Sequence, residues 1–313
     1  MRTKLPEVYL IGAPKAGTTS LAAWLAEHPE IYFSVPKEPY YWAADYPGLR
    51  RHHGFADFDR YLGLFSSTEA QGARLRAEGS TCYLYSERAV PDILESVRNP
   101  RFIVLLRDPV DLLASYHRSQ LIALNENEPD FGVAWRRSLQ GILPATRLLD
   151  AKLVDYPRIG RLGAAMERLL NNVPREHVHV IFLDDLGKDP LAVWRELTAF
   201  LGVSAFTPSF SVLNASDKMY RWAALRRLVH RPPTPLAGPV RNLRRWSQTT
   251  KNAWVGRCKA TLWRPAPKPR INEALRREIA EYLADDVALL SRLLQTDLSH
   301  WLSPMSTDTE QRG

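Results

Sequence analysis

Cysteine is scarce in this chain of 313 residues, and long apolar runs are absent. The two cysteines, Cys82 and Cys258, lie far apart and outside any metal-ligand spacing, so neither a disulfide framework nor a zinc site is indicated. No segment reaches the length that a membrane-spanning helix needs, and residues 1–7 contain no apolar signal region. We therefore expect a cytoplasmic protein, with peripheral contact to a membrane as an open alternative.

Acidic residues are absent from residues 218–272, which contain 14 of the 42 lysines and arginines. The whole chain carries a formal charge of +8, but the remaining 28 basic and 34 acidic residues alone would give −6. Within this segment, residues 219–231 predict a basic amphipathic helix. Such a segment is typical of a solvated insertion, a lid over a ligand, or a contact with a membrane or an acidic carrier. Nucleic acid is disfavoured because no DNA- or RNA-binding motif accompanies the charges.

The amino-terminal part of the sequence contains a pattern that is typical of phosphate binding. A short apolar strand is predicted at 8–12, and a helix begins at Thr18 after a loop that includes Gly12 and Gly17. The glycines allow a tight turn, and the free N–H groups and positive dipole end of the helix favour an oxyanion. A nucleotide-binding P-loop needs a lysine directly after its second glycine, but Thr18 stands there and the lysine is Lys15. The residues that hold ATP and Mg²⁺ in a kinase are therefore not in place.

A second candidate phosphate site follows the apolar run at 102–106, which has the composition of a parallel strand buried on both faces. Asp108 and Pro109 are suited to begin a helix over 110–124. Arg107 is thus expected at the carboxyl end of a strand, where open α/β sheets bind their ligands.

Both patterns resemble motifs of one enzyme family. The run Pro-Lys-Ala-Gly-Thr-Thr-Ser-Leu (14–21) resembles the 5′-phosphosulfate loop of the sulfotransferases that use 3′-phosphoadenosine-5′-phosphosulfate (PAPS). Residues 105–116 resemble the motif with which these enzymes bind the 3′-phosphate. The chain is therefore identified as a member of the PAPS-dependent sulfotransferase family, bacterial type. The resemblance implies that PAPS is bound by Lys15, Ala16, Gly17, Thr18, Thr19, Ser20, Arg107 and Ser115, with Lys218, or alternatively Arg221, at the 3′-phosphate.

The resemblance covers residues 7–302 and implies an α/β fold with a mainly parallel central sheet flanked by helices, the P-loop-like sulfotransferase fold. We expect a single domain over 1–302, in which 218–272 is a lid or an insertion, and a disordered tail over 303–313. Asp184 and Asp185 follow a predicted strand and are interpreted as turn and helix-capping residues, not as metal ligands. Strands are also predicted at 31–33 and 178–182, and helices at 55–65, 131–150, 162–170, 190–201 and 273–294.

Glu38 lies in the sequence Lys-Glu-Pro and is followed by three aromatic residues at 40–42. This arrangement favours a fixed loop beside a dry pocket, where a glutamate can act as a general base. In the sulfotransferases that modify glycans, the glutamate of a similar segment deprotonates the acceptor hydroxyl, so the resemblance implies that Glu38 is the catalytic base. A loop glutamate that only pairs with Lys37 is the alternative.

Residues 77–84 resemble the Glu-Lys-Ser-Pro-x-Tyr segment of the family, which lies beside the acceptor and the reacting phosphosulfate. Gly79 stands where that segment often has a lysine. A second cationic contact to the sulfuryl group is thereby lost, and Lys15 is expected to carry more of the charge stabilisation.

The resulting hypothesis is transfer of a sulfuryl group from PAPS to a hydroxyl, less favourably an amine, of a carbohydrate, a glycolipid or another natural product. Glu38 takes the proton, Lys15 and the loop N–H groups neutralise the leaving phosphate, and no metal is expected. A P-loop kinase-like phosphotransferase and a non-enzymatic basic module for membranes or nucleic acid are the alternatives. The oligomeric state and the identity of the acceptor stay open.

Overall fold

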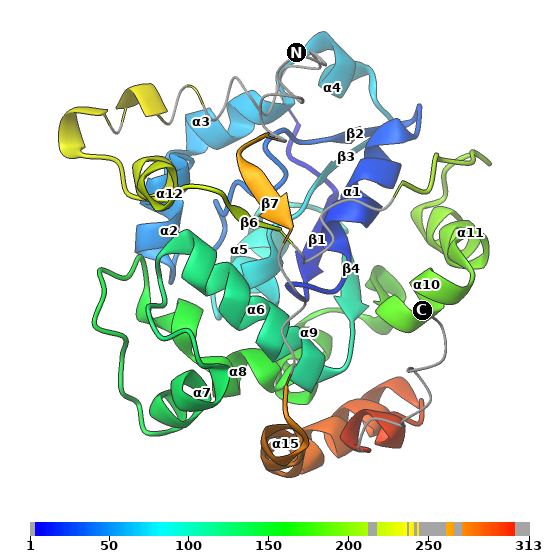
Figure 1. Ribbon diagram of the computed structural model, residues 1–313. Coiled ribbons are helices and arrows are strands. Elements are labelled where there is room, and N and C mark those ends of the chain that lie inside the picture. Colours follow the sequence, from blue (N-terminus) through cyan, green and yellow to red (C-terminus); the bar gives the residue numbers. More distant parts are fainter. Residues whose placement is uncertain are drawn as a thin grey trace.

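The computed structural model describes residues 4–211, 218–236, 238–240, 243, 261–265 and 271–303. Within these residues, five parallel strands form the central sheet in the order β2-β3-β1-β4-β5 (Figure 1). The predicted α/β fold with a mainly parallel sheet flanked by helices is confirmed. The strands are β1 (Val8–Gly12), β2 (Ile31–Phe33), β3 (Leu75–Glu78), β4 (Arg101–Leu106) and β5 (Val178–Phe182).

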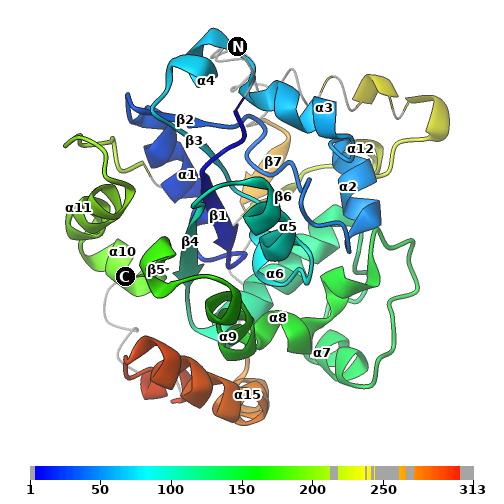
Figure 2. The ribbon, with the colours of Figure 1, turned by 180° about the vertical axis from the view of Figure 1, so that it is seen from behind.

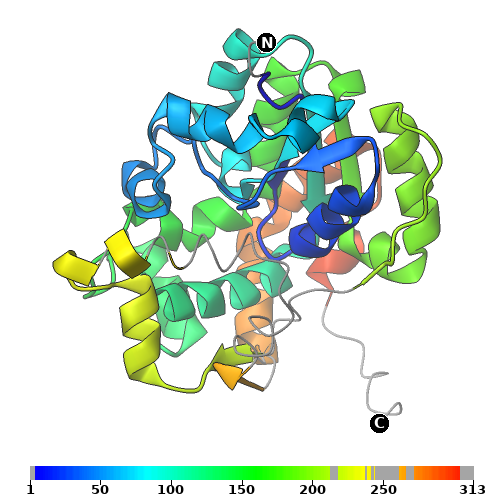
Figure 3. The same cartoon turned by 90° about the horizontal axis from the view of Figure 1, so that it is seen from above.

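Helices cover both faces of this sheet. α1 and α6 lie on the face that is nearer in Figure 1, and α5 and α9 on the face that is nearer in Figure 2. Figure 3 shows α11 and α12 on opposite sides of the molecule. None of the described helices combines the length and the apolar character that crossing a membrane requires. The α-helices are α1 (Thr18–Glu27), α2 (Pro47–His53), α3 (Phe58–Leu62), α4 (Thr68–Gly72), α5 (Ala89–Ser96), α6 (Pro109–Ala123), α7 (Phe131–Leu139), α8 (Tyr156–Gly160), α9 (Leu162–Asn172), α10 (Leu183–Lys188), α11 (Pro190–Leu201), α12 (Ala223–His230) and α15 (Glu273–Leu294).

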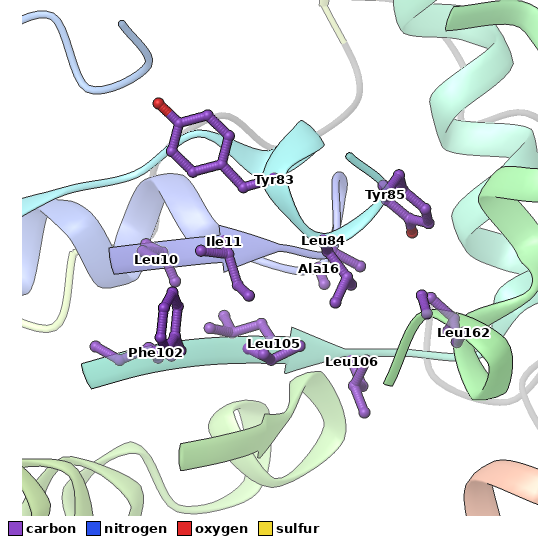
Figure 4. Close-up of a cluster of buried hydrophobic side chains, with 14 of the residues drawn as sticks. Leu10, Ile11, Ala16, Tyr83, Leu84, Tyr85, Phe102, Leu105, Leu106 and Leu162 are labelled. Atoms are coloured by element: carbon purple, nitrogen blue, oxygen red, sulfur yellow. The ribbon is translucent and has the colours of Figure 1, made fainter. Parts of the chain in front are cut away.

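β1 and β4 form the middle of the core. Every residue of β1 is buried, and so are residues 102–106 of β4. Figure 4 shows Leu10 and Ile11 of β1 facing Phe102 and Leu105 of β4. Each large apolar side chain that is fully buried in this way contributes about 1.5–3 kcal/mol to folding. Because strands buried on both faces are continuous apolar runs, the sequence alone located both of them.

β3 was not predicted, because charged residues interrupt its sequence Leu-Arg-Ala-Glu. Arg76 and Glu78 are nevertheless buried in the sheet. Arg76 forms an ion pair with Glu7 and donates a hydrogen bond to the Ala73 carbonyl at 3.1 Å. Glu78 accepts hydrogen bonds from three hydroxyl groups. Partnered charges therefore occupy positions where the sequence pattern for a buried strand requires apolar side chains.

The order of the strands places the topological switch point of the sheet between β1 and β4. The chain goes from β1 to β2 and β3 on one side, whereas β4 and β5 lie on the other side. The N–H group of Ala13 donates to the Leu105 carbonyl at 2.6 Å, so the loop after β1 stays attached to β4. Open α/β sheets bind ligands at the carboxyl ends of the strands that flank such a switch.

Two predictions for helical segments are wrong in detail. The helix expected over 131–150 ends at Leu139, because the chain turns at Gly141, where φ is 72°, and Pro144 follows. Asp184 and Asp185 cap no helix with their side chains but lie in the first turn of α10, which the sequence did not predict. The residue that caps α11 is Asp189, whose carboxylate accepts from the Ala192 N–H group at 2.9 Å.

The basic segment contains α12 and a two-stranded antiparallel sheet, β6 (Lys218–Tyr220) with β7 (Trp263–Pro265). The helix expected over 219–231 therefore begins later than predicted. Arg231 donates to the Asn125 side-chain oxygen at 2.6 Å and to the Arg147 carbonyl at 3.3 Å, which attaches this end of the segment to the protein core. Residues 244–260 and 266–270 of the segment, and 304–313 of the expected tail, lie outside the described residues.

The carboxyl-terminal helix α15 is attached to the start of α6. Arg276 of α15 is buried and forms ion pairs with Asp108, at 2.9 Å, and with Asp111. Asp108 also caps α6, as predicted, since its carboxylate accepts from the Val110 N–H group at 2.7 Å. Burial and the neighbouring Asp111 raise the pKa of Asp108, while Arg276 opposes that change. The segment that carries Arg107 is therefore held by a residue far away in the sequence.

Replacement of this buried arginine is expected to destabilise the fold. Arg276→Met leaves the largely buried Asp108 without its cation, while Asp111 keeps only Arg107 at 3.6 Å, and the free energy of unfolding should fall by about 3 kcal/mol. Urea denaturation at neutral pH measures the loss. Arg136→Met is the control, because Arg136 of α7 forms an ion pair with Glu278 of α15 at an exposed position. Equal denaturation midpoints for the two variants would contradict the anchoring role of Arg276.

Candidate active site

Gly17 shapes the loop between β1 and α1. Its φ is 91°, and a Cβ atom there would lie 3.0 Å from Leu183 Cδ1, so a larger residue would be both strained and crowded. Gly17 is the N-cap of α1, which has no side-chain cap and no acidic residue in its first turn. The positive end of α1 therefore faces no negative side chain of its own and favours an anion, as the sequence predicts.

Lys15 and Arg107, the charged residues of the two phosphate motifs, lie together. Arg107 Nη1 donates to the Lys15 carbonyl oxygen at 3.0 Å, and Arg107 Nη2 lies 3.6 Å from Asp111 Oδ2. Burial lowers the pKa of the Lys15 ammonium, and the positive charges of Arg107 and Arg118 lower it further, whereas Glu38 opposes them. The structure thus gathers three cations at one sheet edge, an arrangement that favours a multiply charged anion.

Arg118 is a member of this group that was not predicted from the sequence. It lies on α6, three residues after Ser115, so both residues occupy one side of the helix. That spacing is the signal that would have identified it. Ser115 is buried on α6, and Thr18 and Ser20 are buried in the first turn of α1. For Lys218 only the backbone position at the start of β6 is described.

Glu38 lies between a cation and a hydroxyl group. Its Oε1 accepts from the Lys37 ammonium at 2.8 Å, and its Oε2 accepts from the Tyr40 hydroxyl. The side chain is 25% exposed, so a substrate hydroxyl has access to it. Lys37 also donates to Thr18 Oγ1 at 3.3 Å, which brings the Glu38 loop against the predicted phosphosulfate loop. The predicted base and the predicted phosphate site are therefore neighbours.

Glu78 is a buried carboxyl group behind this loop. Tyr61 and Tyr83 donate to its Oε1 at 2.9 and 3.0 Å, and Ser80 donates to its Oε2 at 3.0 Å. Burial raises the pKa of Glu78 to about 7, while the three hydroxyl hydrogen bonds oppose the rise. Trp42 donates from its indole to the Tyr61 hydroxyl at 2.8 Å and from its backbone N–H to the Tyr83 hydroxyl at 3.1 Å. Glu78 thus holds together the aromatic residues that follow Glu38.

Aromatic rings extend from Glu38 toward the surface. The rings of Tyr41 and Tyr61 are stacked with centroids 4.4 Å apart, and Phe58 lies beside Tyr41 at 5.8 Å. Phe58 is 42% exposed, and the guanidinium of Arg50 lies 5.2 Å from the centre of the Tyr41 ring. This surface offers apolar rings and a cation to an acceptor molecule.

Within the described part of the chain, histidine, cysteine, aspartate and glutamate side chains do not form a group of three or more that could hold a metal ion. The cations and the helix end described above are the groups that fit an anionic nucleotide.

A profile of the sulfotransferase domain matches residues 5–219 of this sequence. The chain belongs to the sulfotransferase family. This match confirms the family that the two motifs predicted, and it confirms that the protein is an enzyme. The crystal structure of a sulfotransferase from Alicyclobacillus acidocaldarius has the same fold, with a TM-score of 0.69, 23% sequence identity, and coverage of 96% of this chain and 100% of that one.

Curated relatives are also sulfotransferases, but much longer. Carbohydrate sulfotransferase 15 of Homo sapiens is 28% identical over 189 residues, which are 49% of this chain and 32% of that protein. The membrane-associated sulfotransferase kil1 of Dictyostelium discoideum is 32% identical over 127 residues, which are 40% of this chain and 26% of that protein. The chain thus spans about a quarter to a third of the length of these relatives.

The buried carboxyl group gives a prediction for the pH dependence of stability. The pKa of Glu78 is raised in the folded state to about 7. The contribution of its protonated carboxyl group to the free energy of unfolding is therefore complete below about pH 4.5 and is lost as the pH rises through 7. Glu78→Gln imitates the neutral carboxyl group. Relative to this variant, the wild type should lose about 3 kcal/mol of unfolding free energy between pH 4.5 and pH 8. Urea denaturation across this range checks it, and a difference that does not change with pH would contradict it.

Proposed function

We propose that this sulfotransferase transfers a sulfuryl group from PAPS to a hydroxyl group of a carbohydrate. The observation that carries the proposal is the meeting of Lys15, Arg107 and Glu38 at one sheet edge, with Lys37 in contact with both Thr18 and Glu38. Two anion-binding motifs and a candidate base are what a doubly phosphorylated donor and a hydroxyl acceptor require.

Each of the gathered residues has a defined part in the transfer. PAPS supplies an activated sulfuryl group whose leaving group is a phosphate. Glu38 takes the proton of the acceptor hydroxyl while the acceptor oxygen forms its bond to sulfur and the bond from sulfur to the phosphate oxygen breaks. Lys15 and the N–H groups at the start of α1 neutralise the charge that develops on the departing phosphate.

Arg107 and Ser115 are assigned to the 3′-phosphate. A guanidinium group offers a planar pair of donors that suits phosphate oxygens, and the hydroxyl of Ser115 adds a third donor. The position of Arg107 beside the Lys15 loop supports this assignment, because two cations at one sheet edge produce a positive field that favours an anion. Lys218 remains a predicted contact of the 3′-phosphate. A contact of residues 218–272 with a membrane or an acidic carrier also remains a prediction.

A carbohydrate is the proposed acceptor for two reasons. The relatives include carbohydrate sulfotransferase 15, a heparan sulfate glucosamine 3-O-sulfotransferase and a heparan sulfate N-deacetylase/N-sulfotransferase, and the names of all three refer to carbohydrates. In addition, the half-buried ring of Tyr41 and the exposed ring of Phe58 offer flat apolar surfaces of the kind on which sugar rings stack. A hydroxyl is the accepting group that we predict, with an amine as the alternative.

Binding of adenosine 3′,5′-bisphosphate, the product of the donor, tests the proposal. We expect tight binding in calorimetry that EDTA leaves unchanged, because lysine, arginine and backbone N–H groups make the contacts. Absence of binding would refute PAPS as the donor.

Arg107→Ala locates the 3′-phosphate in the same titration. Loss of a charge-assisted pair should weaken the bisphosphate by about 2 kcal/mol while affecting adenosine 5′-phosphate, which lacks the 3′-phosphate, much less. Equal losses for the two nucleotides would show that Arg107 acts only through the Lys15 loop.

Replacement of Glu38 tests the base. Glu38→Gln keeps the size of the side chain but cannot take a proton, so turnover with labelled PAPS and a carbohydrate acceptor should fall about 10²–10⁴-fold. Bisphosphate affinity should stay near that of the wild type. Glu87→Gln is the control, since Glu87 forms an exposed ion pair with Arg158. Normal turnover of the Glu38 variant would remove the base assignment.

A further inference from the structure

Lys37 occupies a position that the sequence analysis regarded only as an ion-pair partner of Glu38. Its ammonium group lies 2.8 Å from Glu38 Oε1 and 3.3 Å from Thr18 Oγ1, and its side chain is 19% exposed. An ammonium group has three N–H donors, and among the described residues Glu38 and Thr18 take two of them. The third N–H donor of Lys37 is therefore available to a ligand between Glu38 and the predicted phosphosulfate loop.

The backbone holds Lys37 in this place. The Gly79 N–H group donates to the Lys37 carbonyl at 3.0 Å, and the Ser34 hydroxyl donates to the Pro36 carbonyl at 3.1 Å. A Cβ atom at position 79 would lie 3.1 Å from Phe33 Cζ and 3.2 Å from Leu10 Cβ. A side chain at 79 would therefore crowd Phe33 and Leu10, whereas the glycine lets the segment that carries Lys37 pack closely against its neighbour.

We propose that Lys37 is a further catalytic residue, whose ammonium group binds an oxygen of the sulfuryl group during transfer. This inference rests on the proposed function. It also accounts for the glycine at position 79, where the family often has a lysine. The second cationic contact to the sulfuryl group then comes from Lys37, on the loop that carries the predicted base. Lys15 therefore acts on the leaving phosphate, and Lys37 acts on the group that moves.

The ion pair with Glu38 makes this cation more effective in the transition state than in the ground state. Before transfer, the negative charge of Glu38 compensates the charge of Lys37. As Glu38 takes the proton of the acceptor it becomes neutral, and the ammonium charge of Lys37 then acts on the sulfuryl oxygens without a counter-charge. Interactions that strengthen only as the reaction proceeds increase the rate of the chemical step. No charge is created or lost by Lys37 itself.

The test compares two nucleotides that differ by the sulfuryl group. If Lys37 binds that group, Lys37→Met should weaken PAPS about 10-fold or more in calorimetry while leaving adenosine 3′,5′-bisphosphate nearly unchanged, and it should lower kcat about 10²–10³-fold. Lys37→Arg keeps the charge and should recover part of both losses. Lys152→Met is the matched control, because Lys152 is another half-buried lysine in a 2.7 Å ion pair, with Asp45.

The outcomes separate this inference from the proposed function. Equal weakening of PAPS and the bisphosphate by Lys37→Met, or unchanged kcat, overturns the role of Lys37 while the function stands. A wild-type protein that binds neither nucleotide overturns both. If Lys37→Met does not fold, the Lys37→Arg variant decides, since a selective loss of PAPS affinity supports the contact and wild-type affinity for both nucleotides together with wild-type kcat overturns it.

Discussion

One hydrogen bond connects the two halves of the site, the one that Arg107 donates to the carbonyl oxygen of Lys15. It joins the loop after β1 to the end of β4, beside the backbone bond from Ala13 to Leu105. β1 and β4 are paired neighbours in the sheet, so the spacing between adjacent strands sets the distance between the two predicted phosphate motifs. The hydrogen bond from Arg107 then holds the Lys15 loop against the end of β4.

The concentration of positive charge at this edge works against the stability of the unliganded protein. Burial is the main cause of the lowered pKa of Lys15, and repulsion from Arg107 and Arg118 lowers that pKa further. Such an arrangement persists only because the surrounding structure holds it, here through Asp111 and the buried Arg276. An anionic ligand reverses the balance, so the energy stored in repulsion becomes binding energy.

The parts of the fold that could be predicted are those whose signal is local. A buried strand followed by a glycine loop and a helix is readable in β1 and α1, and so is the Arg-Asp-Pro start of α6, because each depends on neighbours in sequence. β3 was missed because Arg76 and Glu78 interrupt its apolar pattern, and only the fold shows that Glu7 pairs with Arg76 and that hydroxyl groups satisfy Glu78. Arg276 is 168 residues from Asp108, and no local pattern could assign it to the site. Lys37 was visible, but its contact with Thr18 required the fold.

The attachment of α15 to the start of α6 bears on where this catalytic unit ends. The family match stops at residue 219, yet Arg276, which neutralises Asp108 and Asp111, lies beyond it. A fragment cut at the matched boundary would keep both predicted phosphate motifs but lose the cation that pairs with Asp108 and Asp111. The carboxyl-terminal helix therefore contributes to the folded unit that carries Arg107, although the family match ends before it.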